Sequence, residues 1–166
     1  MGGLKTLAVD LGSTCGFAVG HNGIIKQSGE VALLPPTGQT HPGHRFMKFQ
    51  EWLSNFTDVD EILYEEVPRF ESAAAARVYC GLLCVLQMFS LAHGIRISSL
   101  KASQIKKDFT GYGNAPKEVI CEVAINLGWK KGVRETRDFN NEADAIALFW
   151  VVCLRRNIAP AFETTD

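Results

Sequence analysis

The pattern of apolar and polar positions predicts a chain of short strands interleaved with helices. Apolar runs bounded by turn residues predict five strands, at 4–10, 16–20, 24–31, 61–67 and 95–100. Apolar residues at helical spacing predict five helices, at 44–56, 71–93, 103–109, 115–127 and 141–156. Three strands followed by alternating helices and strands predict an α/β fold, a five-stranded mixed sheet flanked by helices.

The segments between these elements have the composition of turns and loops. Asn22-Gly23 predicts a hairpin turn, residues 33–43 contain three prolines and two glycines, and residues 128–140 are polar. A chain of 166 residues suits one domain with its own core, and we expect it to span 1–158. Residues 159–166 are expected to form a flexible tail.

Composition narrows the class of protein. Hydrophobic residues make up 46% and charged residues 21% of the sequence, as in an ordinary soluble globular protein. The net charge of −1 gives no overall basic field, so any binding of nucleic acid has to come from local patches. The five cysteines form no CxxC pair and follow no signal peptide, so we expect free thiols in a reducing cytoplasm. The longest apolar stretch, 81–92, is interrupted by Gln87 and Ser90, and no membrane partner is expected.

A carboxylate ends the first predicted strand. Leu7 to Val9 are apolar, Asp10 follows at the tip, and Gly12-Ser13 predicts a tight turn. A charge at the end of a buried strand is costly unless a metal ion, a helix N-terminus or a basic side chain pairs with it. Taken alone, Asp10 fits a turn cap and a site residue equally well.

Two other elements bring carboxylates to comparable places. Glu65 and Glu66 lie at the end of the strand 61–67, and since strand side chains alternate, only one of them can face a common site. Asp144 lies on or beside the buried face of the last helix, with Asn141 one turn before it. Glu142 is rotated by about 200° from Asp144 and does not share its face in a regular helix.

These acids predict a metal site. Three converging carboxylates repel one another unless cations neutralise them. Oxygen ligands without a Cys or His pattern suit Mg²⁺ or Mn²⁺. Two such ions can activate a water and stabilise the leaving oxygen of a phosphodiester. The three acids together therefore indicate metal-dependent phosphodiester chemistry.

Four segments stand out in order along the sequence: LAVDLGS at 7–13, YEEV at 64–67, GYGNAPK at 111–117 and EADAIA at 142–147. Together they resemble the RuvC family of Holliday junction resolvases, most closely its small phage branch. The resemblance, from about residue 5 to about residue 152, implies a ribonuclease-H-like fold and a homodimer. It also implies cleavage of four-way DNA junctions and other branched DNA with Mg²⁺ or Mn²⁺, in recombination, repair or phage DNA processing. A bacterial or phage-infected cytoplasm is the implied location.

The resemblance assigns roles to individual residues. It implies that Asp10, Glu65 and Asp144 hold two metal ions, with Glu66 facing away. Asn141 stands where the family often has a fourth acid, so the fourth ligand is Asn141 through its carbonyl oxygen, Glu142 or Asp138. The same comparison puts Lys117 near the scissile phosphate, at a helix N-terminus whose free N–H groups suit an anion.

Basic side chains cluster late in the sequence and predict contacts to a DNA backbone. They are Lys101, Lys106, Lys107, Lys117, Lys130, Lys131, Arg134 and Arg137. Phe70 is either an aromatic wedge near the junction point or a residue packed under the following helix. The helix 72–92 matches the segment that builds the dimer interface in the family, and it also suits an intramolecular core.

Two other interpretations remain open. Residues 10–14 also resemble the first phosphate loop of sugar kinases and actin-like ATPases, but those proteins need two such domains around ATP, and 166 residues are too few. The other is a catalytically weak module of the same fold that binds branched DNA. The retained Asp10, Glu65 and Asp144 argue against it, whereas Asn141 favours it.

Overall fold

The described residues of this computed structural model, 3–34, 41–130 and 140–163, contain six strands in one mixed sheet with the order β5-β4-β1-β2-β3-β6. The strands are β1 Lys5–Asp10, β2 Thr14–His21, β3 Ile24–Ala32, β4 Glu61–Glu66, β5 Arg96–Lys101 and β6 Ala161–Phe162. β1, β2 and β3 are antiparallel neighbours, β4 and β5 run parallel to β1, and β6 runs parallel to β3. The predicted α/β mixed sheet is confirmed, but the predicted count of five strands is one too low.

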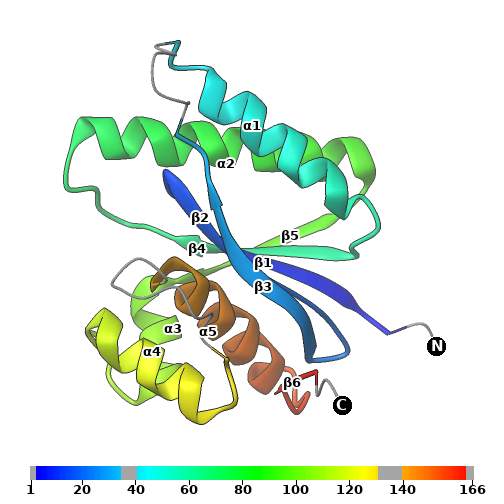
Figure 1. The fold of residues 1–166 in the computed structure, drawn as a ribbon, viewed down its shortest axis with the longest axis vertical. Coiled ribbons are helices and arrows are strands. Elements are labelled where there is room, and N and C mark those ends of the chain that lie inside the picture. Colours follow the sequence, from blue (N-terminus) through cyan, green and yellow to red (C-terminus); the bar gives the residue numbers. More distant parts are fainter. Residues whose placement is uncertain (1–2, 35–40, 131–139, 164–166) are drawn as a thin grey trace.

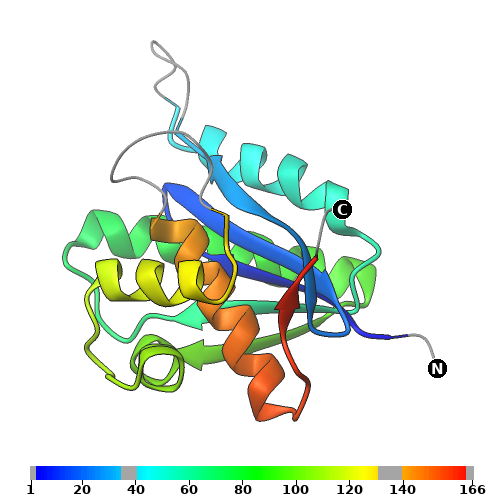
Figure 2. The same cartoon turned by 60° about the horizontal axis from the view of Figure 1, so that its bottom comes forward.

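The helices lie close to their predicted positions and cover both faces of the sheet. They are α1 His44–Leu53, α2 Ala73–His93, α3 Ala102–Thr110, α4 Lys117–Asn126 and α5 Asn140–Arg155. A short 3₁₀ turn, Ser54–Phe56, follows α1. Figure 1 shows α1 and α2 on one face and α3, α4 and α5 on the other, and Figure 2 shows α4 lying over α5.

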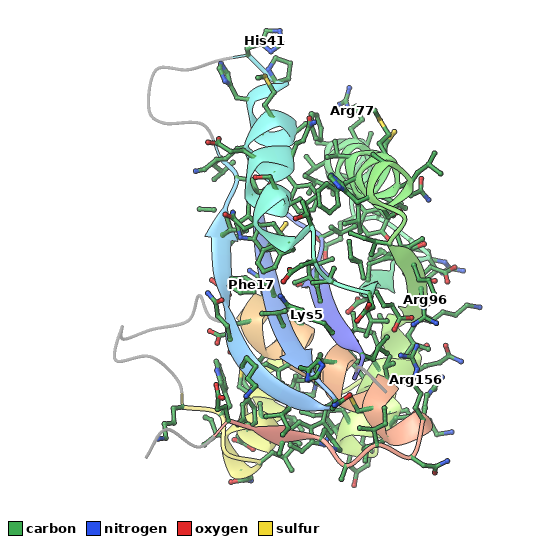
Figure 3. The ribbon with its side chains drawn as sticks, turned by 90° about the vertical axis from the view of Figure 1, so that its right-hand side faces the viewer. Lys5, Phe17, His41, Arg77, Arg96 and Arg156 are labelled. Atoms are coloured by element: carbon green, nitrogen blue, oxygen red, sulfur yellow. The ribbon has the colours of Figure 1, made fainter. Side chains whose placement is uncertain are left out.

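Strand alternation divides the core into two layers. Leu7 and Val9 of β1 pack with α1 and α2, whereas Ala8 packs with α3, α4 and α5. Figure 3 shows the sheet from the side, with Phe17 directed toward α1, where its ring centroid lies 5.3 Å from that of Trp52. Both faces of the sheet are therefore buried, which explains the almost continuous apolar sequence of β1 and β2.

Small residues let α5 approach the sheet closely. On the α5 face, β1 and β2 present Ala8, Gly16, Ala18 and Gly20. A Cβ atom added at Gly20 would lie 2.6 Å from the ring of Phe149 on α5. The helix is also covered by α3 and α4, so it is buried on all sides over most of its length.

Turn and capping residues place the element ends. Asn22 and Gly23 adopt φ angles of 53° and 83°, which confirms the predicted hairpin. The Ser72 side chain accepts a hydrogen bond of 3.1 Å from the N–H of Ala75 and caps α2. Gly94, at φ 66°, ends α2 in the left-handed conformation.

Within the predicted tail 159–166, residues 161–163 pair with β3, and residues 164–166 lie outside the described part of the chain. The N–H of Ala161 donates to the carbonyl of Gly23 at 3.0 Å, and the N–H of Glu163 donates to the carbonyl of Ile25 at 2.9 Å. The Phe162 ring lies 5.6 Å from the Trp150 ring. Two ladder bonds, one aromatic contact and the ion pair between Lys26 and Glu163 hold this segment. A strand of two residues has no periodicity for a sequence pattern to reveal.

One side of α2 is left uncovered. Gly81 packs against α1, since an added Cβ would lie 2.3 Å from the Phe46 ring. Met88, two turns further along the helix, is 66% exposed, and Leu91 is 84% exposed. Within the described residues, α2 is the one helix long and apolar enough to cross a membrane, a test that apolar helices of soluble proteins also pass. Its uncovered side is an exposed apolar surface of the kind that marks interaction sites.

Candidate metal centre

The sheet topology brings the first two predicted acids side by side. β1 and β4 are parallel neighbours in which Val9 pairs with Tyr64, so Asp10 and Glu65 end adjacent strands at the same edge. Glu65 is partly buried and Glu66 is exposed, as the alternation of strand side chains requires. The choice of Glu65 over Glu66 as the inward-facing acid therefore agrees with the strand register.

Gly16 brings the third acid to the same place. This residue pairs with Asp10 across the β1–β2 ladder. A Cβ at Gly16 would lie 1.7 Å from the carbonyl oxygen of Asn141 and 2.6 Å from the amide nitrogen of Glu142. No other residue type leaves room for the first turn of α5 here, and that turn holds Asp144 near Asp10 and Glu65.

The three carboxylates act on one another electrostatically. Burial raises the pKa of Asp10 well above its usual range, and the charges of Asp144 and Glu65 raise it further. Burial and the charge of Asp144 raise the pKa of Glu65 to about 7. Burial also raises the pKa of Asp144, against the opposing effect of Lys117 and Lys106. Such a cluster favours binding of cations or protons over three bare charges.

Two lysines face this cluster. The Nζ atom of Lys117 lies 3.5 Å from an Oδ of Asp144, whose side chain is 12% exposed. Lys117 is the first residue of α4, and Pro116 precedes it with an extended backbone. Lys106 comes from α3, and its charge lowers the pKa of both Glu65 and Asp144. The site thus has two positively charged lysine side chains beside its three acids.

The donor set fits Mg²⁺ or Mn²⁺ bound by few protein ligands. Among the described residues, no three Asp, Glu, His or Cys side chains form a ready-made cage around one ion. Mg²⁺ is usually bound by one or two carboxylates together with waters and substrate phosphates. The oxygen ligands, their mutual repulsion and the partial opening to solvent suit that mode of binding.

Asn141 and Glu142 have different surroundings. Asn141 is partly buried beside the cluster. The carboxylate of Glu142 is buried and accepts hydrogen bonds from Ser28 Oγ at 2.7 Å and from Trp129 Nε1 at 2.9 Å. Both bonds go to Oε1 and hold the Glu142 side chain between Ser28 and Trp129, whereas within the described part of the chain no such pair of bonds holds the side chain of Asn141 away from the cluster. Asp138, the third alternative, lies outside the described residues.

Glu30 is a residue beside the acid cluster that the sequence did not point to. Its carboxylate accepts hydrogen bonds from the N–H groups of Asn141 and Glu142, at 3.1 and 3.2 Å. Its charge also contributes to the raised pKa of Asp10. Glu30 lies in the middle of a strand in a polar stretch, and no sequence motif distinguishes it.

A groove of about 580 Å³ begins at the turn after β1, and we call it the β1 groove. Arg45 donates to Ser13 Oγ at 3.4 Å, and Arg69 also lines the groove. Phe70 is 38% exposed, and its ring centroid lies 5.2 Å from that of Tyr79. The lining residues are Leu11, Gly12, Ser13, Arg45, Val67, Arg69, Phe70, Glu71, Ala74, Ala75, Val78 and Tyr79. Two arginines and two aromatic rings thus line a groove that starts at the turn after Asp10.

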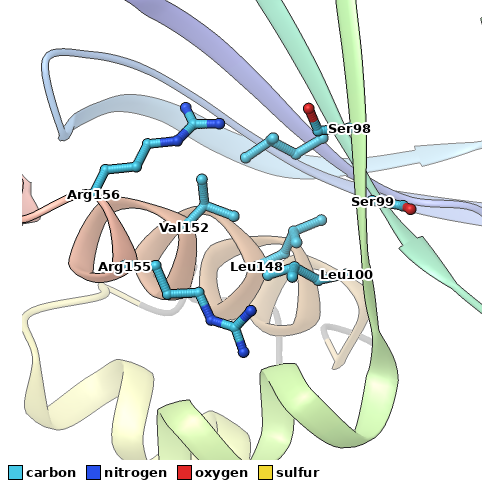
Figure 4. Close-up of a pocket in the computed structure, with 8 residues that line it drawn as sticks. Ser98, Ser99, Leu100, Leu148, Val152, Arg155 and Arg156 are labelled. Atoms are coloured by element: carbon cyan, nitrogen blue, oxygen red, sulfur yellow. The ribbon is translucent and has the colours of Figure 1, made fainter.

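A smaller cavity of about 190 Å³ lies between β5 and the C-terminal half of α5 (Figure 4). Its arginines are already paired. Arg156 binds both carboxylate oxygens of Glu61, at 2.6 and 2.9 Å, and Arg155 binds Asp108 at 2.7 and 2.8 Å. Burial alone would raise the pKa of Glu61, but the bonds from Arg156 and Ser98 outweigh it and lower that pKa. This cavity is therefore part of the structural framework rather than an anion site.

The predicted DNA contacts are spread over three elements. Lys106 and Lys107 lie on α3, Lys117 begins α4, and Lys130 is exposed after α4. Lys131 and Arg134 lie outside the described residues. Of these residues, Lys106 and Lys117 face the acid cluster, and Lys107 lies on the same helix as Lys106.

Comparisons with known proteins bear on the fold. No protein-family model and no curated protein matches the sequence. Thermus thermophilus RuvC in complex with a Holliday junction substrate superimposes with a TM-score of 0.72 and 20% identity, over 92% of this chain and 94% of that one. A second Thermus thermophilus RuvC structure gives 0.68 and 18%, over 95% and 99%. The yeast mitochondrial Holliday junction resolvase Ydc2 gives 0.67 and 14%, over 92% and 81%.

These likenesses define the class of fold. The chain has the α/β ribonuclease-H-like fold of RuvC, with a mixed sheet between two layers of helices. The resemblance noted in four short sequence segments is thereby confirmed for the fold of nearly the whole chain.

Proposed function

We propose that this protein is a metal-dependent endonuclease that cleaves branched DNA, four-way junctions included. The observation that supports this most strongly is the convergence of Asp10, Glu65 and Asp144 from three separate elements. The relatives of the same fold include a RuvC bound to a Holliday junction substrate and a mitochondrial Holliday junction resolvase.

Each acid has a role in this proposal. Asp10, Glu65 and Asp144 hold two Mg²⁺ or Mn²⁺ ions, with Asn141 as an uncharged additional ligand. Bound cations would supply an activated water for attack on the phosphodiester and would stabilise the leaving oxygen. The protein's own contribution is to hold three carboxylates at fixed positions on two strands and one helix, where their repulsion favours cation binding.

Lys117 steadies charge at the phosphate. In the structure its ammonium pairs with Asp144. When Asp144 contributes its charge to a cation instead, Lys117 can turn to a phosphate oxygen at the N-terminus of α4, where free backbone N–H groups also attract an anion. The charge of Lys106 also acts on the acid cluster, and this lysine is suited to a neighbouring phosphate of the DNA.

The β1 groove is proposed as the path of one DNA strand. Its arginines, Arg45 and Arg69, suit phosphates, and the exposed edge of Phe70 suits stacking on a base near the junction point. Phe70 also packs against Tyr79, so both alternatives considered for it have support. Lys107, Lys130, Lys131 and Arg134 remain predicted contacts to the DNA backbone.

A homodimer through α2 is proposed because of the uncovered apolar side of that helix. Burying Met88 and Leu91 against a second copy would remove this side from water. A two-fold dimer also gives two acid clusters, which a symmetric junction needs for paired cuts.

The proposal is tested with labelled DNA of defined shape. The protein is incubated with a four-way junction, a fork and a linear duplex of the same sequence, in Mg²⁺, in Mn²⁺ and in EDTA. We expect metal-dependent cuts in the junction and the fork, and far less cleavage of the duplex. Tight binding of the junction without cleavage in either metal would show a binding module instead. Stabilisation by ATP, with no binding of branched DNA, would support the kinase-like alternative.

A further inference from the structure

Three paired residues form a line across the sheet beside the metal centre. Asp10 of β1 pairs with Gly16 of β2, and Gly16 pairs with Glu30 of β3. Directly paired residues on antiparallel strands present their side chains on the same face. Asp10 and Glu30 therefore stand on either side of a position that has no side chain.

The first turn of α5 occupies this gap. The main chain at Asn141 and Glu142 lies directly over Gly16. Glu30 Oε1 accepts hydrogen bonds from the N–H groups of both residues, which are the second and third of α5. A helix has unpaired N–H groups in its first turn, and a carboxylate is a strong acceptor for them because it also opposes the positive end of the helix dipole.

These bonds fix the part of α5 that faces the metal centre. Asn141 is itself a candidate ligand, and Asp144 follows one turn later. A rigid helix turn transmits the position of its bonded amides to the side chains of the same turn. Groups that hold ligands in place behind a metal are as important for affinity as many direct ligands.

We propose that Glu30 is a positioning residue of the metal centre. It clamps the first turn of α5 over Gly16 and thereby fixes Asn141 and Asp144 opposite Asp10. The clamp itself is independent of function, but its effect on cation binding rests on the nuclease proposal above.

The test uses two substitutions at Glu30 and a control on the same strand. Glu30→Ala removes the acceptor, Glu30→Gln keeps an oxygen acceptor without the charge, and Gln27→Ala changes an exposed residue of β3. Amide exchange at Asn141 and Glu142, followed by NMR without metal or DNA, reports on the clamp. Calorimetry with Mn²⁺ and the Mn²⁺ dependence of junction cleavage report on its consequence.

For Glu30→Ala we expect faster exchange at both amides and a loss of Mn²⁺ affinity of about 10- to 100-fold. Raising the Mn²⁺ concentration restores most of its cleavage rate, whereas Glu30→Gln and Gln27→Ala stay within about threefold of the wild type. Unchanged amide exchange in Glu30→Ala would overturn the clamp. A Glu30→Gln protein as weak as Asp10→Asn in Mn²⁺ binding would overturn the positioning role and make Glu30 a direct ligand. A wild-type protein that neither binds Mn²⁺ nor cuts junctions would overturn the nuclease proposal, whatever the exchange data show.

Discussion

The ammonium of Lys117 lies 3.5 Å from the carboxylate of Asp144, so the first residue of α4 opposes the charge of an acid near the start of α5. In the proposed function, Lys117 competes with a metal ion for Asp144 and also binds a phosphate. Lys117→Ala should keep or increase Mn²⁺ affinity and yet lower the rate of junction cleavage by about 10²-fold. Calorimetry and single-turnover cleavage measure the two effects separately.

Lys48→Ala, which removes an exposed charge from α1, is the control and should change neither quantity. A Lys117→Ala protein that binds Mn²⁺ more weakly and cleaves at the normal rate would contradict both roles of Lys117.

The pH dependence of stability should reveal the strain of the acid cluster. The pKa of Glu65 is raised from 4.5 to about 7, so its protonated form is favoured in the folded state. The stability that this group contributes is complete below about pH 4.5 and is lost as the pH rises through 7. In EDTA the free energy of unfolding should therefore fall between pH 5.5 and 8 by on the order of 1–3 kcal/mol more than in Glu65→Gln.

Thermal unfolding of the two proteins across this pH range gives the difference directly, and histidine titration cancels between them. Added Mn²⁺ should stabilise the wild type more at pH 8 than at pH 5.5. Identical pH profiles for wild type and Glu65→Gln would show that Glu65 is an ordinary surface acid.

Gly16 should be intolerant of any side chain. Gly16→Ala places a methyl group against the main chain of Asn141, and a helix backbone cannot yield as a side chain can. We expect a loss of about 1–3 kcal/mol in stability together with loss of Mn²⁺ binding, as measured by urea unfolding and calorimetry.

Gly29→Ala is the matched control, because an added Cβ there meets only the edge of the Phe17 ring, at 3.1 Å, on the opposite face of the sheet. It should cost less stability and leave Mn²⁺ binding intact. Equal effects of the two substitutions on Mn²⁺ affinity would contradict the placement of α5 by Gly16.

The uncovered side of α2 should govern the oligomeric state. Met88→Glu or Leu91→Glu puts a charge into the proposed dimer interface and should give a monomer in sedimentation velocity. Met47→Glu, which charges an exposed position on α1, should leave the dimer unchanged. A wild type that is monomeric in solution and binds to phospholipid vesicles would assign this surface to a membrane instead.

Sequence patterns predicted most of the elements, and they pointed to three acids that the structure brings close together. Apolar periodicity predicted all the helices, because their buried faces are long. Strand alternation showed that only one of Glu65 and Glu66 can face the site, and the family resemblance chose Glu65, which is the more buried of the two. Helical spacing separated Asp144 from Glu142, and the structure gives Glu142 its own partners, Ser28 and Trp129.

Glu30 could not be predicted, and the reason is a β-bulge. The β2–β3 register shifts between Val19 and Gly20, so Gly16 pairs with Glu30. An uninterrupted hairpin from the same turn would pair Cys15 with Glu30 and direct Glu30 to the opposite face of the sheet. The groups that position α5 depend on this local irregularity, which apolar periodicity does not encode.

Junction cleavage by two variants that differ at adjacent positions tests the catalytic assignment most directly. Glu65→Gln changes the acid that faces Asp10 and Asp144, and Glu66→Gln changes its exposed neighbour. With Mn²⁺ and a labelled four-way junction, both variants should bind the DNA. Glu65→Gln should cleave at least about 10³-fold more slowly than the wild type, and Glu66→Gln within about threefold of it. Full cleavage by Glu65→Gln, or equal loss in the two variants, would contradict a metal-dependent nuclease built on Asp10, Glu65 and Asp144.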